Sequence, residues 1–342
     1  RSRLPALCRA MKEQEIRPSG LTEEYRRLTD VDAPQYFDER DRQWQACVAC
    51  GGTEVQPEFE KTGFAYVTCK NCGTLFLNPR PAKASFDAFY QDSESARYWA
   101  EVFFPAVAEV RREKLFRPRV ERLGNLLEEE ITGIRHVVDV GAGYGIFLEE
   151  WGRRWPDTRL VAVEPSSSLA GVCQTRGLEV VEAVVEEVVD HDGSADLVTC
   201  FEVLEHVHDP LAFVQSLVRL LRPGATLVIS TLTIDGFDLQ VLWDKSVQIH
   251  PPHHINFLSK NGLGQLFTRA GLVDIDISTP GELDVDIVRN AMESQPDSSK
   301  CRRIVDALAP DEQSAASLQK HLRLHRLSSH AWVMAHRPPA TA

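Results

Sequence analysis

Apolar positions in the second half of the chain follow two alternating patterns. Short apolar runs predict strands at 136–140, 159–163, 179–183, 196–201, 225–231, 272–278 and 331–337. Helical periodicity predicts helices at about 145–154, 167–175, 210–221 and 260–270. This alternation favours an α/β fold in which a seven-stranded, mostly parallel sheet carries helices on both faces.

The chain before residue 131 has a different pattern and divides into three segments. Residues 1–43 are expected to form a charged, helical lead-in. Residues 44–81 are short, turn-rich and cysteine-bearing, and Pro79 and Pro81 mark their end. Residues 82–130 have helical periodicity and are expected to cover a ligand site on the main domain, which we place at 131–342.

A glycine-rich turn follows the first predicted strand of the main domain. The apolar run ends in Asp139, the turn carries Gly141, Gly143 and Gly145, and the second strand ends before Glu164. This is the order of a nucleoside-binding βαβ unit, in which the second acid binds the ribose hydroxyls. The alternative is a turn that serves tight packing alone.

The spacing of the glycines narrows the choice of ligand. The G-x-G-x-G order leaves little room for a pyrophosphate at the helix N-terminus, so S-adenosyl-L-methionine (SAM) fits better than a dinucleotide. The predicted cofactor-binding residues are Asp139, Gly141, Ala142, Gly143, Glu164, Pro165, Val184, Phe201 and Glu202.

Composition restricts the partners and the compartment. The 342 residues carry a net charge of −12, which disfavours a nucleic-acid partner. No apolar run approaches the roughly 18 residues of a membrane span, and no signal peptide is visible, so a cytoplasmic protein is expected. The first residue is Arg1, which suggests a trimmed or longer native protein, or one that works within a biosynthetic complex.

Four of the eight cysteines form two C-x-x-C-G pairs. Cys47, Cys50, Cys69 and Cys72 supply four sulfurs, which suit tetrahedral zinc with no open position. Such a site is structural, and we expect it to serve folding or substrate docking. Redox chemistry is the competing interpretation.

A second group of polar residues follows the fourth predicted strand of the main domain. Glu202, Glu205 and His206 stand at i, i+3 and i+4, the spacing of one helical face, and could share a divalent metal. After the next strand, His250, His253 and His254 surround two prolines that predict a rigid loop. Alternatively, Glu205 and His206 only form hydrogen bonds to loops above the sheet, and the histidine loop is only a solvent-exposed segment.

Taken together, these motifs resemble class I SAM-dependent methyltransferases. The stretches VVDVGAGYG, FEVLEHVHDP and LRPGATLVIST, together with Glu164, carry the resemblance over about residues 110–340, and it implies a Rossmann-like fold. The zinc ribbon and HHINFLS resemble a narrower group of bacterial zinc-ribbon methyltransferases that act on sugars. E-x-x-E-H resembles ubiquinone-pathway and small-RNA methyltransferases, which implies a divalent cation such as Mg on Glu202, Glu205, His206 and one of His253 or His254.

The resemblance implies transfer of a methyl group from SAM to a hydroxyl of a sugar in a surface polysaccharide, a lipopolysaccharide or a nucleotide-linked sugar. Either the metal or the histidines would assist the transfer by taking up or weakening the hydroxyl proton. The candidate catalytic residues are Glu205, His206, His253 and His254. C-methylation of a sugar and another small-molecule O-methylation are the alternatives, and the short C-terminal region disfavours the former. A non-catalytic SAM-fold protein that recruits a partner through its ribbon is a hypothesis of another class.

Overall fold

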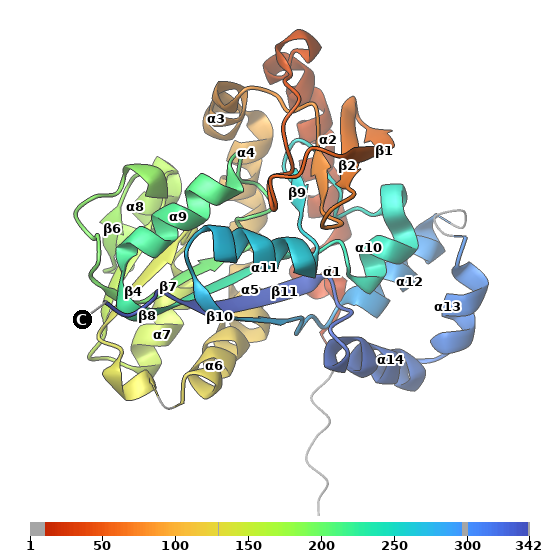
Figure 1. Ribbon diagram of the computed structural model, residues 1–342. Helices are drawn as coiled ribbons and strands as arrows, with labels where there is room; N and C mark the ends of the chain where they lie inside the picture. Colours follow the sequence, from red (N-terminus) through yellow and green to blue (C-terminus); the bar gives the residue numbers. More distant parts are fainter. Residues whose placement is uncertain (1–10, 129, 296–299, 341–342) are drawn as a thin grey trace, which may run out of the picture.

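A seven-stranded sheet forms the centre of the molecule. The computed structural model describes residues 11–128, 130–295 and 300–340 (Figure 1). The sheet consists of β4 (His136–Val140), β5 (Arg159–Val163), β6 (Glu179–Val181), β7 (Ala195–Phe201), β8 (Leu221–Leu232), β10 (Val273–Ser278) and β11 (His330–His336). The order is β10-β11-β8-β7-β4-β5-β6, and β11 runs antiparallel to both its neighbours. The predicted mostly parallel sheet is confirmed, because the five strands from β8 to β6 pair in parallel.

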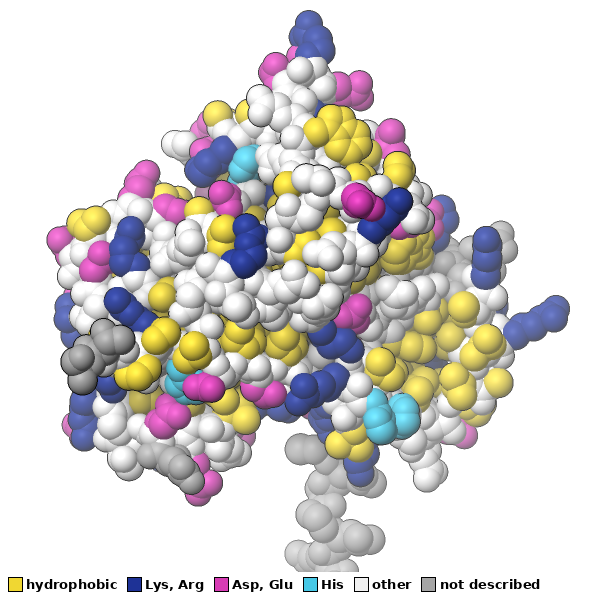
Figure 2. All heavy atoms as spheres, in the orientation of Figure 1, with side chains coloured by type: hydrophobic (Ala, Val, Ile, Leu, Met, Phe, Trp, Pro, Cys, Tyr) yellow, Lys and Arg dark blue, Asp and Glu magenta, His cyan; other side chains and the backbone are white. Residues whose placement is uncertain are grey.

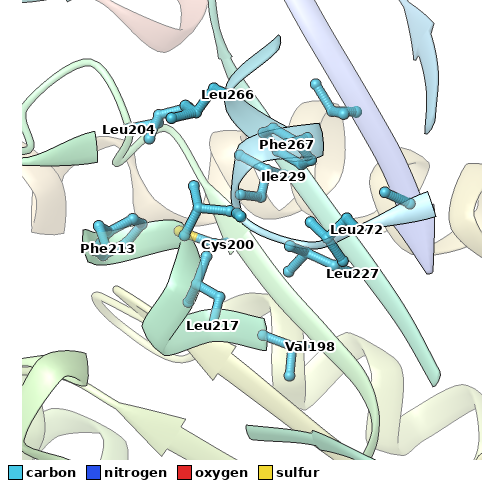
Figure 3. Packing of buried hydrophobic residues seen from close by; sticks show 14 of the residues in the cluster. Val198, Cys200, Leu204, Phe213, Leu217, Leu227, Ile229, Leu266, Phe267 and Leu272 are labelled. Carbon is cyan, nitrogen blue, oxygen red and sulfur yellow. The ribbon is translucent and has the colours of Figure 1, made fainter. Parts of the chain in front are cut away.

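Helices cover both faces of this sheet, as predicted. The four expected helices are α7 (Ile146–Arg154), α8 (Ser167–Thr175), α9 (Pro210–Leu220) and α11 (Lys260–Arg269). Along β7, Val198 and Cys200 face α9 and α11, where they meet Leu217 and Leu266 (Figure 3). Leu197, one residue before Val198, packs on the opposite face in the cluster that includes residues of α6 and α7. Because strand side chains alternate between faces, each apolar strand contributes to both cores.

A four-stranded antiparallel sheet is built on the cysteine-bearing segment. It contains β1 (Val55–Lys61), β2 (Phe64–Cys69), β3 (Leu75–Leu77) and β9 (Asn256–Phe257), in that order. The sequence did not predict β9, a two-residue strand that follows the histidine loop. It joins the ribbon to the main domain, and a further bridge pairs Thr233 with Leu258.

The remaining helices surround the two sheets. The N-terminal and covering segments form α1 (Glu13–Ile16), α2 (Ser19–Tyr36), α3 (Lys83–Asp92), α4 (Glu94–Tyr98), α5 (Phe104–Arg111) and α6 (Arg117–Leu126), with π-helical turns at Trp99–Phe103 and Arg112–Phe116. The later helices are α10 (Phe237–Leu242), α12 (Asp284–Ser294), α13 (Arg302–Leu308) and α14 (Glu312–Leu324). Short 3₁₀ turns lie at Glu39–Asp41, Ile131–Gly133, Val185–Glu187 and Trp243–Lys245.

The surface has no single dominant charge on the face that Figure 2 shows, where acidic, basic and apolar side chains are interspersed. Of the helices in the described part of the chain, none combines the length and the apolar character that crossing a bilayer requires.

Arg80 links the ribbon to the main domain through its buried side chain. It is 1% exposed, and its Nη atoms donate to the His208 carbonyl at 2.6 Å and to Asn256 Oδ1 at 2.7 Å. Burial lowers the pKa of Arg80 to about 10. Its backbone also pairs with Gln43 through two hydrogen bonds of 2.8 Å. One side chain therefore ties the end of the ribbon to the segment after β7 and to β9.

Replacing Arg80 should destabilise the fold. Arg80→Met would leave the His208 carbonyl and Asn256 Oδ1 without their donors, which should cost roughly 2–4 kcal/mol of unfolding free energy. Urea unfolding followed by circular dichroism measures this change. Arg40→Gln is the control, because that side chain is 87% exposed. Equal midpoints for Arg80→Met and the parent chain would contradict the prediction.

Candidate functional site

A large cavity opens where the order of the parallel strands reverses. β4 pairs with β5 on one side and with β7 on the other, so the connections leave the sheet in opposite directions and create a crevice at the carboxyl ends of the strands. The cavity measures about 1850 Å³ and includes Gly141, Glu164, Glu202 and His254 in its wall. Single-ligand pockets usually measure about 300–1000 Å³, so this cavity has room for a cofactor and an acceptor together.

The three glycines of the turn have left-handed backbones for different reasons. The φ angles are +72° at Gly141, +56° at Gly143 and +68° at Gly145. A Cβ at Gly141 would lie 2.5 Å from Val203 Cγ2, and one at Gly145 would lie 2.5 Å from Leu178 Cδ1. A Cβ at Gly143 meets nothing within 4 Å, and Gly143 lines the cavity. Packing requires two of the glycines, whereas the third leaves space for a ligand.

Glu164 is held at the edge of the cavity by the backbone. Its Oε2 accepts a hydrogen bond from Gly143 N at 2.8 Å, and its Oε1 accepts one from Ser166 N at 3.0 Å. Burial raises the pKa of Glu164, and the two N–H donors partly oppose that shift. A carboxylate oxygen can accept more than one hydrogen bond, so both oxygens can still accept ribose hydroxyls.

The other predicted cofactor residues fall into two groups. Pro165, Val184 and Glu202 line the cavity. Asp139, Ala142 and Phe201 are absent from its wall and lie behind it. Asp139 accepts a 2.7 Å hydrogen bond from the Thr199 hydroxyl, and burial raises its pKa to about 7. The Phe201 ring packs against Phe147 and Trp332. Asp139 and Phe201 therefore contribute to the packing of β4 and β7 next to the turn, and Ala142, within the turn, packs against the core.

The predicted helical face of Glu202, Glu205 and His206 is wrong. Glu202 has a φ of +58°, and the chain from 202 to 207 forms a turn instead of a helix. The left-handed residue directs the Glu202 carboxylate toward the Ser230 hydroxyl, which donates to it at 2.5 Å, and toward His330 Nδ1 at 3.3 Å. Burial alone would raise the pKa of Glu202, but His330, Arg119 and Ser230 hold it well below its usual range.

Glu205, His206 and His254 converge. Each offers one ligand atom, and these atoms lie within 4.8 Å of one another. Glu202 does not belong to this group, so three of the four predicted ligands come together, and His254 is the histidine that joins them from the loop. Glu205 accepts a 2.9 Å hydrogen bond from the Thr231 hydroxyl, and burial together with Glu202 raises its pKa to about 8.

Backbone carbonyls fix the two histidines of this cluster. Nδ1 of His206 lies 2.9 Å from the His253 carbonyl oxygen, and Nδ1 of His254 lies 2.5 Å from that of Gln248. An Nδ1–H that donates to a carbonyl leaves Nε2 with a free lone pair, and metal-binding histidines are commonly oriented by such a hydrogen bond. Burial lowers the pKa of His206 to about 3 and of His254 to about 4, so both rings are neutral. Two imidazoles and a carboxylate suit a divalent cation.

His253 is turned away from the cluster. Its Nε2 lies 2.9 Å from the Tyr25 hydroxyl and 3.1 Å from the Thr29 hydroxyl, both on α2. The side chain is 3% exposed, and burial holds its pKa well below the usual value. Its carbonyl oxygen, which orients His206, is its contribution to the cluster.

Asn256 fixes the turn that carries Glu205 and His206. Its Nδ2 donates to the Leu204 carbonyl at 3.1 Å and to that of Val207 at 2.7 Å. The Asn256 backbone N–H also donates to the Glu205 carbonyl at 3.1 Å. Sequence patterns do not predict this role of Asn256, because it depends on a pairing between distant segments.

The four predicted zinc ligands also converge. The Sγ atoms of Cys47 and Cys72 are 3.6 Å apart, as are those of Cys50 and Cys69, and all four lie within 4.8 Å. Zn–S bonds of about 2.3 Å in a tetrahedron place sulfurs about 3.8 Å apart, so the arrangement fits a tetrahedral ion. Gly51 and Gly73 have φ angles of +76° and +81°, as the two turns require. The donor set therefore fits zinc.

The sequence missed part of the cavity wall. Arg17, Tyr25 and Arg26 reach it from the N-terminal segment, Arg111 and Arg119 from the covering helices, and His330 and Trp332 from β11. Such residues stand in no recognisable motif, since only the tertiary fold brings them to one place.

Comparison with known proteins agrees with this geometry. Residues 108–277 match the family described as "Methyltransferase domain". The "Ubiquinone biosynthesis O-methyltransferase" of Xanthomonas oryzae pv. oryzae (strain PXO99A) is 37% identical over 162 residues, which are 44% of this chain and 66% of that protein. The protein of the same name from Xanthomonas campestris pv. campestris (strain B100) is 33% identical over 155 residues, which are 42% and 64%. The chain thus matches just under two thirds of the length of these relatives.

Among the solved structures to which the chain is similar is the "O-methyltransferase family protein from Burkholderia thailandensis". It is 14% identical, with 74% of this chain and 64% of that chain covered at a TM-score of 0.48. The sheet order, the glycine turn and the matched segment define a class I methyltransferase fold. The chain contains a methyltransferase domain of the SAM-dependent type.

Glu164 should control the affinity for SAM. In Glu164→Gln the amide loses the charged acceptors for the ribose hydroxyls, and a charge-assisted hydrogen bond contributes about 1.5–3 kcal/mol, which is roughly 10–100-fold in affinity. Isothermal titration with SAM measures the loss. Glu179→Gln, on the exposed end of β6, is the matched control and should bind like the parent. Unchanged affinity in Glu164→Gln would remove Glu164 from the cofactor site.

Proposed function

We propose that this protein transfers the methyl group of SAM to a hydroxyl oxygen of a small-molecule acceptor. The supporting observation is that one cavity holds the Gly143–Glu164 cradle and the cluster of Glu205, His206 and His254. The first binds the methyl donor, and the second handles the proton of the acceptor. The names of the Xanthomonas relatives also favour transfer to oxygen over transfer to carbon.

Positioning is the main task of the chain in this reaction. The sulfonium of SAM is already activated, so the new C–O bond forms as the C–S bond breaks once the hydroxyl oxygen lies about 3 Å from the methyl carbon and in line with it. Glu164 and the glycine turn hold the donor. Helix α2 and the covering helices line the opposite wall and help to exclude water.

The hydroxyl proton must leave as the bond forms. A divalent cation held by Glu205, His206 and His254 would act as a Lewis acid and lower the pKa of that hydroxyl. The chain's own contribution is to keep both imidazoles neutral, with Nε2 of His206 and of His254 available as a ligand or as a general base.

As acceptor we propose a sugar hydroxyl. The size of the cavity and its many polar side chains suit a hydroxyl-rich molecule. The four-cysteine ribbon, through its resemblance to that of sugar methyltransferases, also supports the proposal. The aromatic side chains of Tyr25, Trp99 and Phe103 in the same wall would suit another acceptor, an aromatic hydroxyl compound.

Product analysis tests the proposal. The full chain is incubated with isotope-labelled SAM and separate pools of sugar nucleotides, oligosaccharides and phenolic compounds. Label on oxygen of a carbohydrate supports the sugar, label on a phenol transfers the assignment to aromatic acceptors, and label on carbon overturns O-methylation. A chain that binds no SAM by calorimetry would be a non-catalytic member of the fold.

Removal of divalent metal should lower activity. EDTA treatment followed by gel filtration should reduce methyl transfer at least about 100-fold, because the Lewis acid contributes several kcal/mol, and added Mg²⁺ should restore it. Glu205→Gln should show the same loss without rescue. Glu94→Gln is the control, because the Glu94 side chain is exposed. Full activity in both the EDTA-treated chain and Glu205→Gln would show that the cluster holds no catalytic metal.

We also propose one structural zinc ion on the four cysteines. Cys47 and Cys72 pack with Leu263 and Leu266 of α11, so loss of the ion should loosen the ribbon and that helix together. Cys69→Ser should lose zinc by plasma mass spectrometry and lower the melting temperature. Cys301→Ser, outside the cluster, should retain both. A zinc-free parent chain with an unchanged melting curve would refute this proposal.

A further inference from the structure

Several cationic side chains line the cavity without carboxylate partners. Arg17, Arg26 and Arg111 all contribute to its wall. Within residues 11–128, 130–295 and 300–340, no carboxylate oxygen lies within 4.0 Å of their guanidinium groups. Arg119, by contrast, lies 3.7 Å from Glu202. Arg122 also lines the cavity without such a partner among the described residues, but its guanidinium lies over the Trp332 ring, 5.8 Å from the ring centre. In a chain with a net charge of −12, arginines without carboxylate partners in one cavity need a physical reason.

The three arginines are partly removed from water, and Arg17 is near enough to repel each of the other two. Arg111 is 9% exposed, its Nε donates to the Ile16 carbonyl at 3.1 Å, and its guanidinium lies 5.3 Å from the centre of the Trp99 ring. Burial lowers the pKa of Arg111 to about 9, and repulsion by Arg17 adds to that shift. Burial also lowers the pKa of Arg26, which Arg17 again repels. Like charges held together this way destabilise the empty cavity and favour an anion in it.

The acidic residues around these arginines do not neutralise them. Glu13, Glu23 and Asp30 attract Arg26 only from beyond ion-pair distance. Glu13, which lines the cavity, accepts a 3.0 Å hydrogen bond from Asn290 with its Oε2. The positive charge of Arg26 is therefore available to a ligand.

Two unpartnered polar atoms in the same wall point to a ligand independently. Gln248 is 4% exposed, and its Nε2 has no hydrogen-bond partner among the described residues. Nε2 of His250 is buried and equally without a partner in that part of the chain. Both residues line the cavity, and Arg26 contributes to the lowered pKa of His250. Buried polar groups are normally hydrogen-bonded. Neither atom is open to the cavity as the side chains stand, so a change of side-chain rotamer would bring each of them to a ligand.

We propose that Arg17, Arg26 and Arg111 bind a phosphate group of the acceptor, with Gln248 and His250 as additional hydrogen-bonding groups. This inference rests on the proposed function, since it makes the methylated molecule a phosphorylated one. Guanidinium groups match the geometry of phosphate oxygens, and three of them suit a multiply charged phosphate or diphosphate better than a single carboxylate. The cavity volume accommodates such a molecule beside SAM.

Titration with inorganic pyrophosphate tests the subsite without any methyl transfer. The full chain, in metal-free buffer with saturating S-adenosylhomocysteine, should bind pyrophosphate by calorimetry. Arg17→Gln and Arg26→Gln should each weaken binding about 10-fold or more, because each removes a charge-assisted hydrogen bond. Arg97→Gln is the matched control, because Arg97 lines the cavity but its exposed side chain pairs with Glu94, and it should bind as the parent does.

Other arms of the experiment separate the explanations. Glu205→Gln should retain the affinity for pyrophosphate. If this variant lost that affinity, the anion would belong to the metal cluster, and the arginine subsite would be overturned. Malonate that binds more tightly than pyrophosphate would overturn the phosphate assignment. Absence of pyrophosphate binding to the parent chain would overturn the whole inference. SAM affinity, measured separately on each variant, should stay unchanged. If the parent chain bound no SAM, the proposed function would fail, whatever the result with pyrophosphate.

Discussion

The hydrogen bond between Arg80 and Asn256 is the interaction on which the geometry of the site depends. Arg80 ends the ribbon, and Asn256 occupies the short strand that follows the histidine loop. Asn256 in turn holds the carbonyls of Leu204 and Val207, on either side of Glu205 and His206. The ribbon, the loop and the turn after β7 are therefore one connected unit, and the position of the cluster is set from outside the α/β sheet.

This connection changes the role of the cysteine ribbon. A ribbon that served only to bind substrates or partners would lie on the surface and pack loosely against the main domain. Here Ser259, the N-cap of α11, donates its hydroxyl hydrogen bond to the Cys72 carbonyl, and Arg269 at the far end of the helix donates to the Ala49 carbonyl. Both cysteine turns thus contact α11, which also packs on the main sheet (Figure 3). The ribbon belongs to the framework of the site.

Sequence periodicity was sufficient for the main sheet, because buried parallel strands are apolar runs and the helices between them have amphipathic spacing. Local chemistry also predicted the glycine turn, Glu164 and the four cysteines, where short spacing determines the geometry. It failed at Glu202, whose left-handed backbone breaks the assumed helical face. It also failed for Arg17 and Arg26, because nothing local distinguishes a cavity arginine from a solvated one. Contacts between distant segments decide both cases.

The hydrogen bonds between α2 and the His253 ring have a consequence for the orientation of His206. Tyr25 and Thr29 hydrogen-bond the His253 ring, and the carbonyl of the same residue orients His206. Movement of α2 away from the cavity, as entry of a large molecule from that side would require, would release the ring and relax the tautomer of His206. The orientation of His206 therefore depends on the same contacts that keep α2 against the wall of the cavity.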